Sequence, residues 1–79
     1  MEVDAIILEG QARLLNVPTD SLKEFVTKFN AAAVAEDLVA DFTDTRKVDE
    51  RSLEVQWTRG ETKGVARFDL ETQTLALLR

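Results

Sequence analysis

The stretch SLKEFVTKFNAAA, residues 21–33, carries the strongest periodic signal in the sequence. Its apolar side chains recur at intervals of three and four residues, which places them on one face of an α-helix. The members of this face are Leu22, Phe25, Val26, Phe29 and Ala33. Ser21 directly precedes the first of them and has the spacing of a capping box with Glu24, while Asp20 and Thr19 are the alternative caps. We therefore predict a helix over about residues 20–35.

The segment before this helix is also periodic, over about residues 3–15. One predicted apolar face contains Val3, Ile6, Ile7, Leu14 and Leu15. Gly10 occupies the matching position between them, where it either allows close packing or marks a break. A hairpin through Glu9 and Gly10 is the competing interpretation. Pro18 ends the segment, and Asn16 is a suitable helix terminator.

The second half of the chain alternates between apolar and polar residues, as half-buried strands do. We predict strands over about residues 52–59, 64–70 and 74–78. The predicted inward set is Leu53, Val55, Trp57, Ala66, Phe68, Leu70, Leu75 and Leu77. Residues 38–43 fit either a continued helix or a strand, and we favour the strand. The charged run over residues 43–51 predicts a loop.

These elements predict an α+β fold in one small domain over residues 1–79. Two N-terminal helices precede a three- or four-stranded antiparallel β-meander, with one sheet face on the helices and the other in water. A chain of 79 residues has room for one core and little spare stability.

Several function classes are disfavoured by what the sequence lacks. It contains no cysteine, histidine or tyrosine, which removes thiol chemistry and the commonest transition-metal ligand. No spacing indicates a metal or cofactor site, and we expect neither, nor an enzyme. The N-terminus has no signal-peptide pattern, and no apolar run is long enough to span a bilayer. We therefore expect a cytoplasmic protein that does not bind membranes.

One local pattern, within residues 10–29, points to nucleic acid. The spacing of Ala12, Asn16, Val17 and Leu22 is similar to that of the bacterial repressor helix-turn-helix. The resemblance implies a DNA-binding transcriptional regulator whose second helix reads base edges. The candidate DNA contacts in that helix are Thr19, Ser21, Lys23 and Lys28. Asp20 and Glu24 would face phosphates there, so we keep DNA binding as the alternative.

A protein is the favoured partner of this chain, whose net charge is −5. One candidate binding surface is an acidic strip made of Glu36, Asp37, Asp41, Asp44, Asp49 and Glu50. The other is the C-terminal strand, where Ala76 and Leu78 point away from the core near Val65 and leave an unprotected apolar edge. That edge suits a homodimer or an added partner strand. We expect a small, acidic, non-enzymatic protein-binding module, such as an accessory or inhibitory subunit of phage or mobile-element type.

Overall fold

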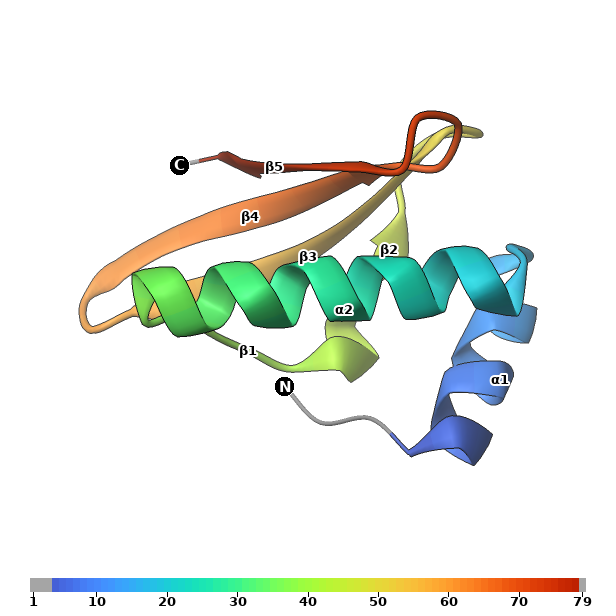
Figure 1. The fold of residues 1–79 in the computed structure, drawn as a ribbon, viewed down its shortest axis with the longest axis horizontal. Coiled ribbons are helices and arrows are strands. Elements are labelled where there is room, and N and C mark those ends of the chain that lie inside the picture. The colour runs from blue at the N-terminus through green and yellow to red at the C-terminus, as the bar shows by residue number, and fades with distance from the viewer. Residues whose placement is uncertain (1–3, 79) are drawn as a thin grey trace.

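A computed structural model describes residues 4–78 and has the predicted α+β architecture. Two helices are followed by an antiparallel sheet (Figure 1). In chain order the elements are α1 (Ala5–Leu15), α2 (Thr19–Glu36), β1 (Val39–Ala40), the 3₁₀ turn η1 (Phe42–Asp44), β2 (Arg46–Lys47), β3 (Ser52–Arg59), β4 (Thr62–Asp69) and β5 (Thr74–Leu78).

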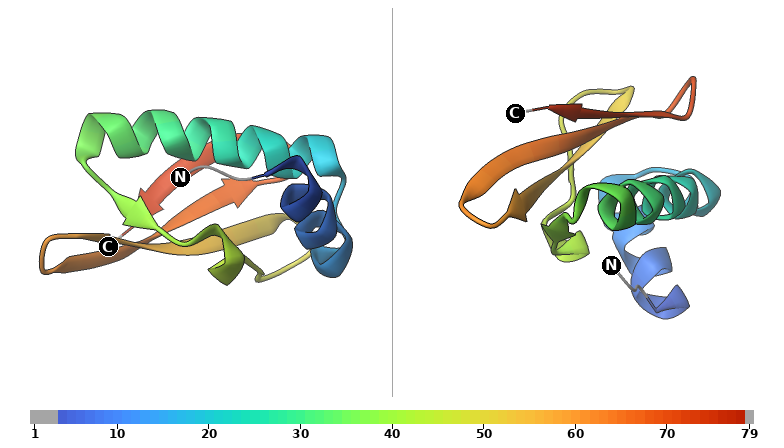
Figure 2. Two further views of the ribbon diagram at one scale, coloured as in Figure 1. Left: turned by 90° about the horizontal axis from the view of Figure 1, so that it is seen from below. Right: turned by 60° about the vertical axis from the view of Figure 1, so that its left-hand side comes forward.

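The sheet has the order β1-β3-β4-β5, and β2 also pairs with β3. The long hairpin of β3 and β4 forms its centre, with Leu53 opposite Phe68 and Val55 opposite Ala66. Both helices lie on the same side of the sheet, and α2 runs along it (Figures 1 and 2). The opposite face of the sheet is covered by no helix of the described chain.

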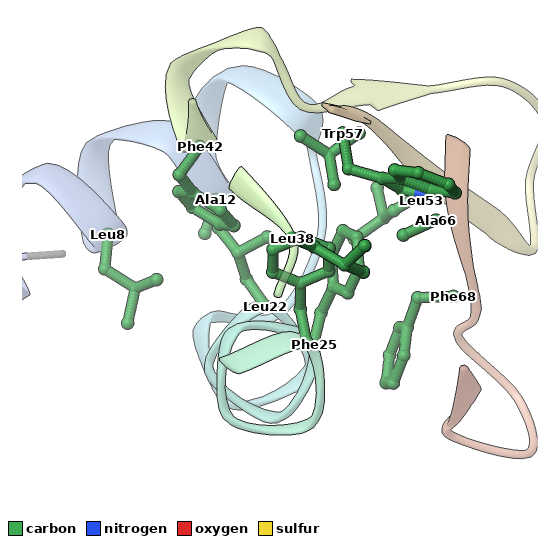
Figure 3. Close-up of a cluster of buried hydrophobic side chains, with 12 residues drawn as sticks. Leu8, Ala12, Leu22, Phe25, Leu38, Phe42, Leu53, Trp57, Ala66 and Phe68 are labelled. Carbon is green, nitrogen blue, oxygen red and sulfur yellow. The ribbon is translucent and has the colours of Figure 1, made fainter. Parts of the chain in front are cut away.

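The core forms where α2 meets the sheet (Figure 3). Its fully buried side chains come from α2, β3 and β4, and the largest of them are Phe25, Phe29, Phe68, Leu22, Leu53 and Val55. The rings of Phe25 and Phe68 are stacked, with centroids 5.2 Å apart and an angle of 17° between their planes. The predicted α2 face is therefore confirmed as the buried face, with Val26 and Ala33 at its margin.

The start of α2 differs from the prediction. The helix begins at Thr19, Pro18 is its N-cap, and no side chain caps it. The capping box of Ser21 and Glu24 and the alternative caps at Asp20 and Thr19 are therefore wrong. Pro18 has φ −61°, an angle that the proline ring already fixes for entry into a helix. The terminator expected at Asn16 is confirmed, because this residue ends α1 in the left-handed conformation with φ 57°.

The predicted apolar face of α1 points the wrong way. Leu8 and Ala12 are the buried residues of this helix, and Leu15 packs partly against the core. Ile6, Ile7 and Leu14, which the periodicity placed on the apolar face, are exposed; Val3 lies outside the described residues. The helix carries apolar side chains on two opposite sides, so its periodicity could not show which side the core covers.

Residues 38–43 do not form the single strand that we predicted. Asp41 accepts hydrogen bonds from the backbone N–H and the hydroxyl of Thr43, at 3.0 and 2.7 Å, and so replaces the strand with a turn. This turn places Phe42 in the core, 4% exposed. The run predicted as a loop contains β2, whose Arg46 pairs with Glu54.

Gly64 lies beneath the Trp57 ring, and we expect Gly64→Ala to destabilise the fold. A Cβ there would overlap the Trp57 ring and the Leu78 carbonyl oxygen. Both neighbours are fixed by the core and the β4–β5 ladder, so we expect a loss of about 1–3 kcal/mol in the free energy of unfolding. Urea unfolding measures it. Lys63→Ala, an exposed change on the same strand, is the control, and equal midpoints for the two variants would contradict the close approach.

Candidate functional site

The free edge of β5 is the candidate site. This strand pairs with β4 on one side, and no strand of the described chain pairs with its other side. Its sequence, Thr-Leu-Ala-Leu-Leu, contains no charge and no proline. Edge strands usually carry such residues because bare backbone groups invite pairing with another chain. The edge is therefore chemically open to an added strand.

The hairpin geometry decides which backbone groups point outward. Gly60 and Glu61 form a two-residue turn with φ 60° at Gly60, typical of a type II′ hairpin, in which the closing pair is hydrogen-bonded. Alternation along the antiparallel ladder then gives every second pair the same bonds, and the bond from Leu70 N–H to the Arg51 carbonyl, 2.6 Å, continues this series.

The same alternation carries on into β5. In the β4–β5 register, Leu78 lies opposite Val65 and Ala76 lies opposite Arg67. Because β4 uses Val65 and Arg67 to bond outward, Ala76 and Leu78 bond back to β4. The N–H and C=O groups of Leu75 and Leu77 therefore face the free edge.

One end of β5 is held by a bonded turn. Asp69 accepts hydrogen bonds from the N–H groups of Glu71 and Thr72, at 2.8 and 3.0 Å, and from the Arg51 guanidinium at 3.0 Å. On the helix side of this turn, Lys28 donates to the Gln73 carbonyl. The edge is thus presented by an anchored strand.

The side chains of the edge divide between the two sheet faces. Val65 and Leu78 lie opposite one another on the open face, as predicted, and Leu78 is 40% exposed. Leu75 is half-buried on the helix side. Leu77 has the predicted inward register but is 37% exposed, because no further strand covers it.

A small hollow opens on the helix side of the sheet, between β3 and β5. Its volume is about 150 Å³, and it is lined by Glu36, Leu38, Trp57, Arg59 and Leu77. An ion pair between Glu36 and Arg59, 3.3 Å between Oε2 and Nη1, lies among these residues. Because β3 and β5 flank β4, the hollow lies over β4, and Leu77 stands between it and the free edge.

The structure does not bring the predicted acidic strip together. Glu36 and Asp37 lie at the C-terminal end of α2, Asp41 and Asp44 at η1, and the pair 49–50 in the turn before β3. These three segments are well separated in Figure 1. Several of the carboxylates also have local partners.

Two of these carboxylates accept hydrogen bonds from residues close to them in the chain. Asp41 bonds to Thr43, and this contact holds the Asp41 pKa below its ordinary value. Asp49 accepts from the Arg51 N–H at 2.7 Å. A binding role for the strip stays a prediction.

The candidate DNA contacts lie along the first half of α2. Thr19 and Ser21 are half-buried, and Lys23 is exposed. Lys28 is engaged with the Gln73 carbonyl and with Glu24, 3.9 Å between Nζ and Oε1. Lys23 is therefore the one lysine of this set whose side chain forms no hydrogen bond or ion pair with another described residue. DNA binding also stays a prediction.

Sequence reasoning missed the outward backbone groups of Leu75 and Leu77 and the hollow beside them. Alternation identified the strand, but the turn type that decides which N–H groups face outward depends on the Gly60 dihedral angle. The hollow joins α2, β3 and β5, and no local pattern records such a junction.

Comparison with known proteins finds no matching family model, no similar curated protein and no similar solved structure. Within residues 4–78, no helix has the length and apolar character needed to cross a bilayer. The same residues contain no group of acidic side chains arranged to hold a metal ion.

Asp69 makes the anchored turn sensitive to acid. The Thr72 N–H, followed by the Glu71 N–H and Arg51, holds the Asp69 pKa below its ordinary value of about 3.9. A carboxylate with a lowered folded-state pKa stabilises the fold above its unfolded pKa, and this contribution is lost as the pH falls through the folded pKa. We expect Asp69→Asn to remove this titration and so narrow the difference between the urea midpoints at pH 7 and pH 3.

Glu61→Gln is the matched control, because the Glu61 carboxylate forms no ion pair with another described residue. Its pH dependence should equal that of the wild type. An Asp69→Asn protein with an undiminished difference between the two pH values would show that the turn does not depend on this carboxylate.

Proposed function

We propose that this protein is a non-enzymatic protein-binding module that takes up an extended segment of a partner protein along β5. The added segment would extend the sheet by one strand. The observation that carries the proposal is the free edge itself, which presents the N–H and C=O groups of Leu75 and Leu77 with no charge, proline or covering element among the described residues.

Backbone bonds give affinity in strand addition, and side-chain pockets give selectivity. On the helix side, the half-buried Leu75 and the exposed Leu77 offer apolar contact to the side chains of an added strand. On the open face, Val65 and Leu78 offer apolar contact to a residue of alternate position. The preferred partner is therefore an extended segment with apolar side chains at alternating positions.

Amide hydrogen exchange tests the geometry before any partner is known. We expect the amides of Leu75 and Leu77 to exchange faster than those of Ala76 and Leu78, because only the latter pair bonds to β4. Residue-resolved NMR exchange rates on the isolated protein measure this. The reverse order would contradict the assignment of the outward groups.

Binding is tested with a displayed library of short random peptides. Selected peptides are titrated into ¹⁵N-labelled protein, and we expect shifts centred on residues 74–78 with new exchange protection at Leu75 and Leu77. Leu77→Pro removes one outward N–H without removing a bond to β4, so it should weaken peptide binding at least tenfold. Val34→Ser, at an exposed position of α2, is the matched control.

Three results would overturn the proposal. One is a selection that yields no binding peptide up to millimolar concentration. Another is a peptide titration in which the amide chemical shifts change at the acidic residues of α2 and η1 and not at residues 74–78. The third is a mixed-sequence DNA duplex that shifts residues 19–28 and loses this effect with added salt, which would favour the DNA-binding alternative.

A further inference from the structure

Helix α1 exposes a stripe of apolar side chains that the fold does not use. Its inner side packs on the core through Leu8, Ala12 and Leu15. Its outer side leaves Ile6 80%, Ile7 53% and Leu14 84% exposed. We call the outer set the α1 stripe; its members are Ile6, Ile7, Gly10 and Leu14. Three large, exposed aliphatic side chains on one helix face are typical of a surface that contacts another molecule.

Gly10 lies at the centre of this stripe, and the chain's own packing does not account for it. A Cβ added at Gly10 would meet no atom of the other described residues within 4 Å, apart from the backbone of its own helix. Glycine destabilises the interior of a helix relative to alanine, so alanine would suit an isolated α1 better. A second helix that crosses α1 closely at this point would require a residue without a side chain there, which explains the glycine.

The stripe is complementary to itself. Ile6, Gly10 and Leu14 are spaced by four residues each, so they form one ridge along the helix. When two copies of α1 pack antiparallel about a twofold axis at Gly10, Ile6 of each copy meets Leu14 of the partner subunit. This apolar contact is made twice, once on each side of the axis, as an isologous interface requires.

Charges on the flank of the stripe select the antiparallel arrangement. Glu9 and Arg13 are exposed, lie one helical turn apart on the same flank, and form no ion pair within the described chain. Antiparallel helices bring identical flanks together, which places Glu9 near Arg13 of the partner subunit. A parallel pair would set this flank against the side of the helix that carries Gln11. That side has no charged residue at the height of Glu9 or Arg13.

We propose that the α1 stripe binds a second copy of this chain, with the two α1 helices antiparallel across Gly10. An 11-residue helix is only about 16 Å long, so the interface is smaller than that of standard stable complexes. The dimer therefore dissociates on dilution. This inference does not rest on strand addition at β5, which a contact through α1 leaves free.

Sedimentation equilibrium of the full chain, from ten micromolar to one millimolar, tests the proposal. We expect a reversible monomer–dimer equilibrium for the wild type. Gly10→Ala should weaken the dimer at least fivefold, because the added methyl group holds the helices apart. The same variant should raise the urea midpoint of the dilute monomer, since no described residue obstructs the methyl group. Val34→Ala, which shortens an exposed apolar side chain of α2, is the control and should leave dimerisation unchanged.

Charge reversal tests the antiparallel orientation. Glu9→Arg and Arg13→Glu should each weaken the dimer, because each places like charges together across the axis. The double variant restores opposite charges and should recover wild-type association. Because the double variant also restores opposite charges within its own helix, a mixture of the two single variants separates the two effects. Only a contact across the axis predicts that the mixture associates more strongly than either single variant alone.

Three outcomes would overturn the proposal. The first is a wild type that stays monomeric through one millimolar. The second is a dimer that Gly10→Ala leaves intact and Leu77→Pro abolishes, which would place the second copy at β5. The third is a charge-reversed double variant that is no better than either single variant.

Discussion

The packing of α2 on the β3–β4 hairpin is the contact on which the rest of the structure depends. Leu22, Phe25 and Phe29 are completely buried there, and Phe25 stacks on Phe68 of the sheet. Full burial of side chains of this size contributes about 1.5–3 kcal/mol each. Because so short a chain has one core, elements that miss this contact are held by few residues.

Both candidate surfaces lie at the margin of that core. At the start of β5, Lys28 of α2 donates a hydrogen bond to the Gln73 carbonyl. Near the end of β5, Leu77 lines the hollow. α1 is fixed through Leu8 and Ala12, with its outer side left free. The core thus secures one side of each element, and the side it cannot reach remains available to a partner.

The sequence predicted the fold well wherever an element has one buried face. The 3.6-residue period of α2 and the two-residue period of β3 each separate a fully buried side from a polar one. β4 starts at Thr62, two residues before its predicted start, because the connecting turn consists only of Gly60 and Glu61. Turn geometry of this kind extends a ladder without leaving a change in the hydrophobic pattern.

Prediction failed where two faces compete or where a side chain bonds to its own backbone. α1 is apolar on both sides, so its period identified a real stripe but not its direction. Asp41 replaced the middle of a plausible strand with a turn through its bonds to Thr43. The hydrophobic pattern alone could not predict the candidate site. The outward direction of the Leu75 and Leu77 backbone groups follows from an alternation of hydrogen bonds that begins at the Gly60 turn, far from β5 in the sequence.

The two surfaces differ in symmetry, and each symmetry suits a different one of the proposed partners. The α1 stripe has a centre at Gly10 and matching residues on either side of it, which suits a twofold axis. The β5 edge is asymmetric, because an anchored turn lies at its start and the hollow beside Leu77 lies near its end. In Figure 1 the two elements lie apart, so one contact does not block the other. A dimer through α1 would then present two β5 edges, and a partner with two suitable segments would bind it with greater avidity than either edge alone provides.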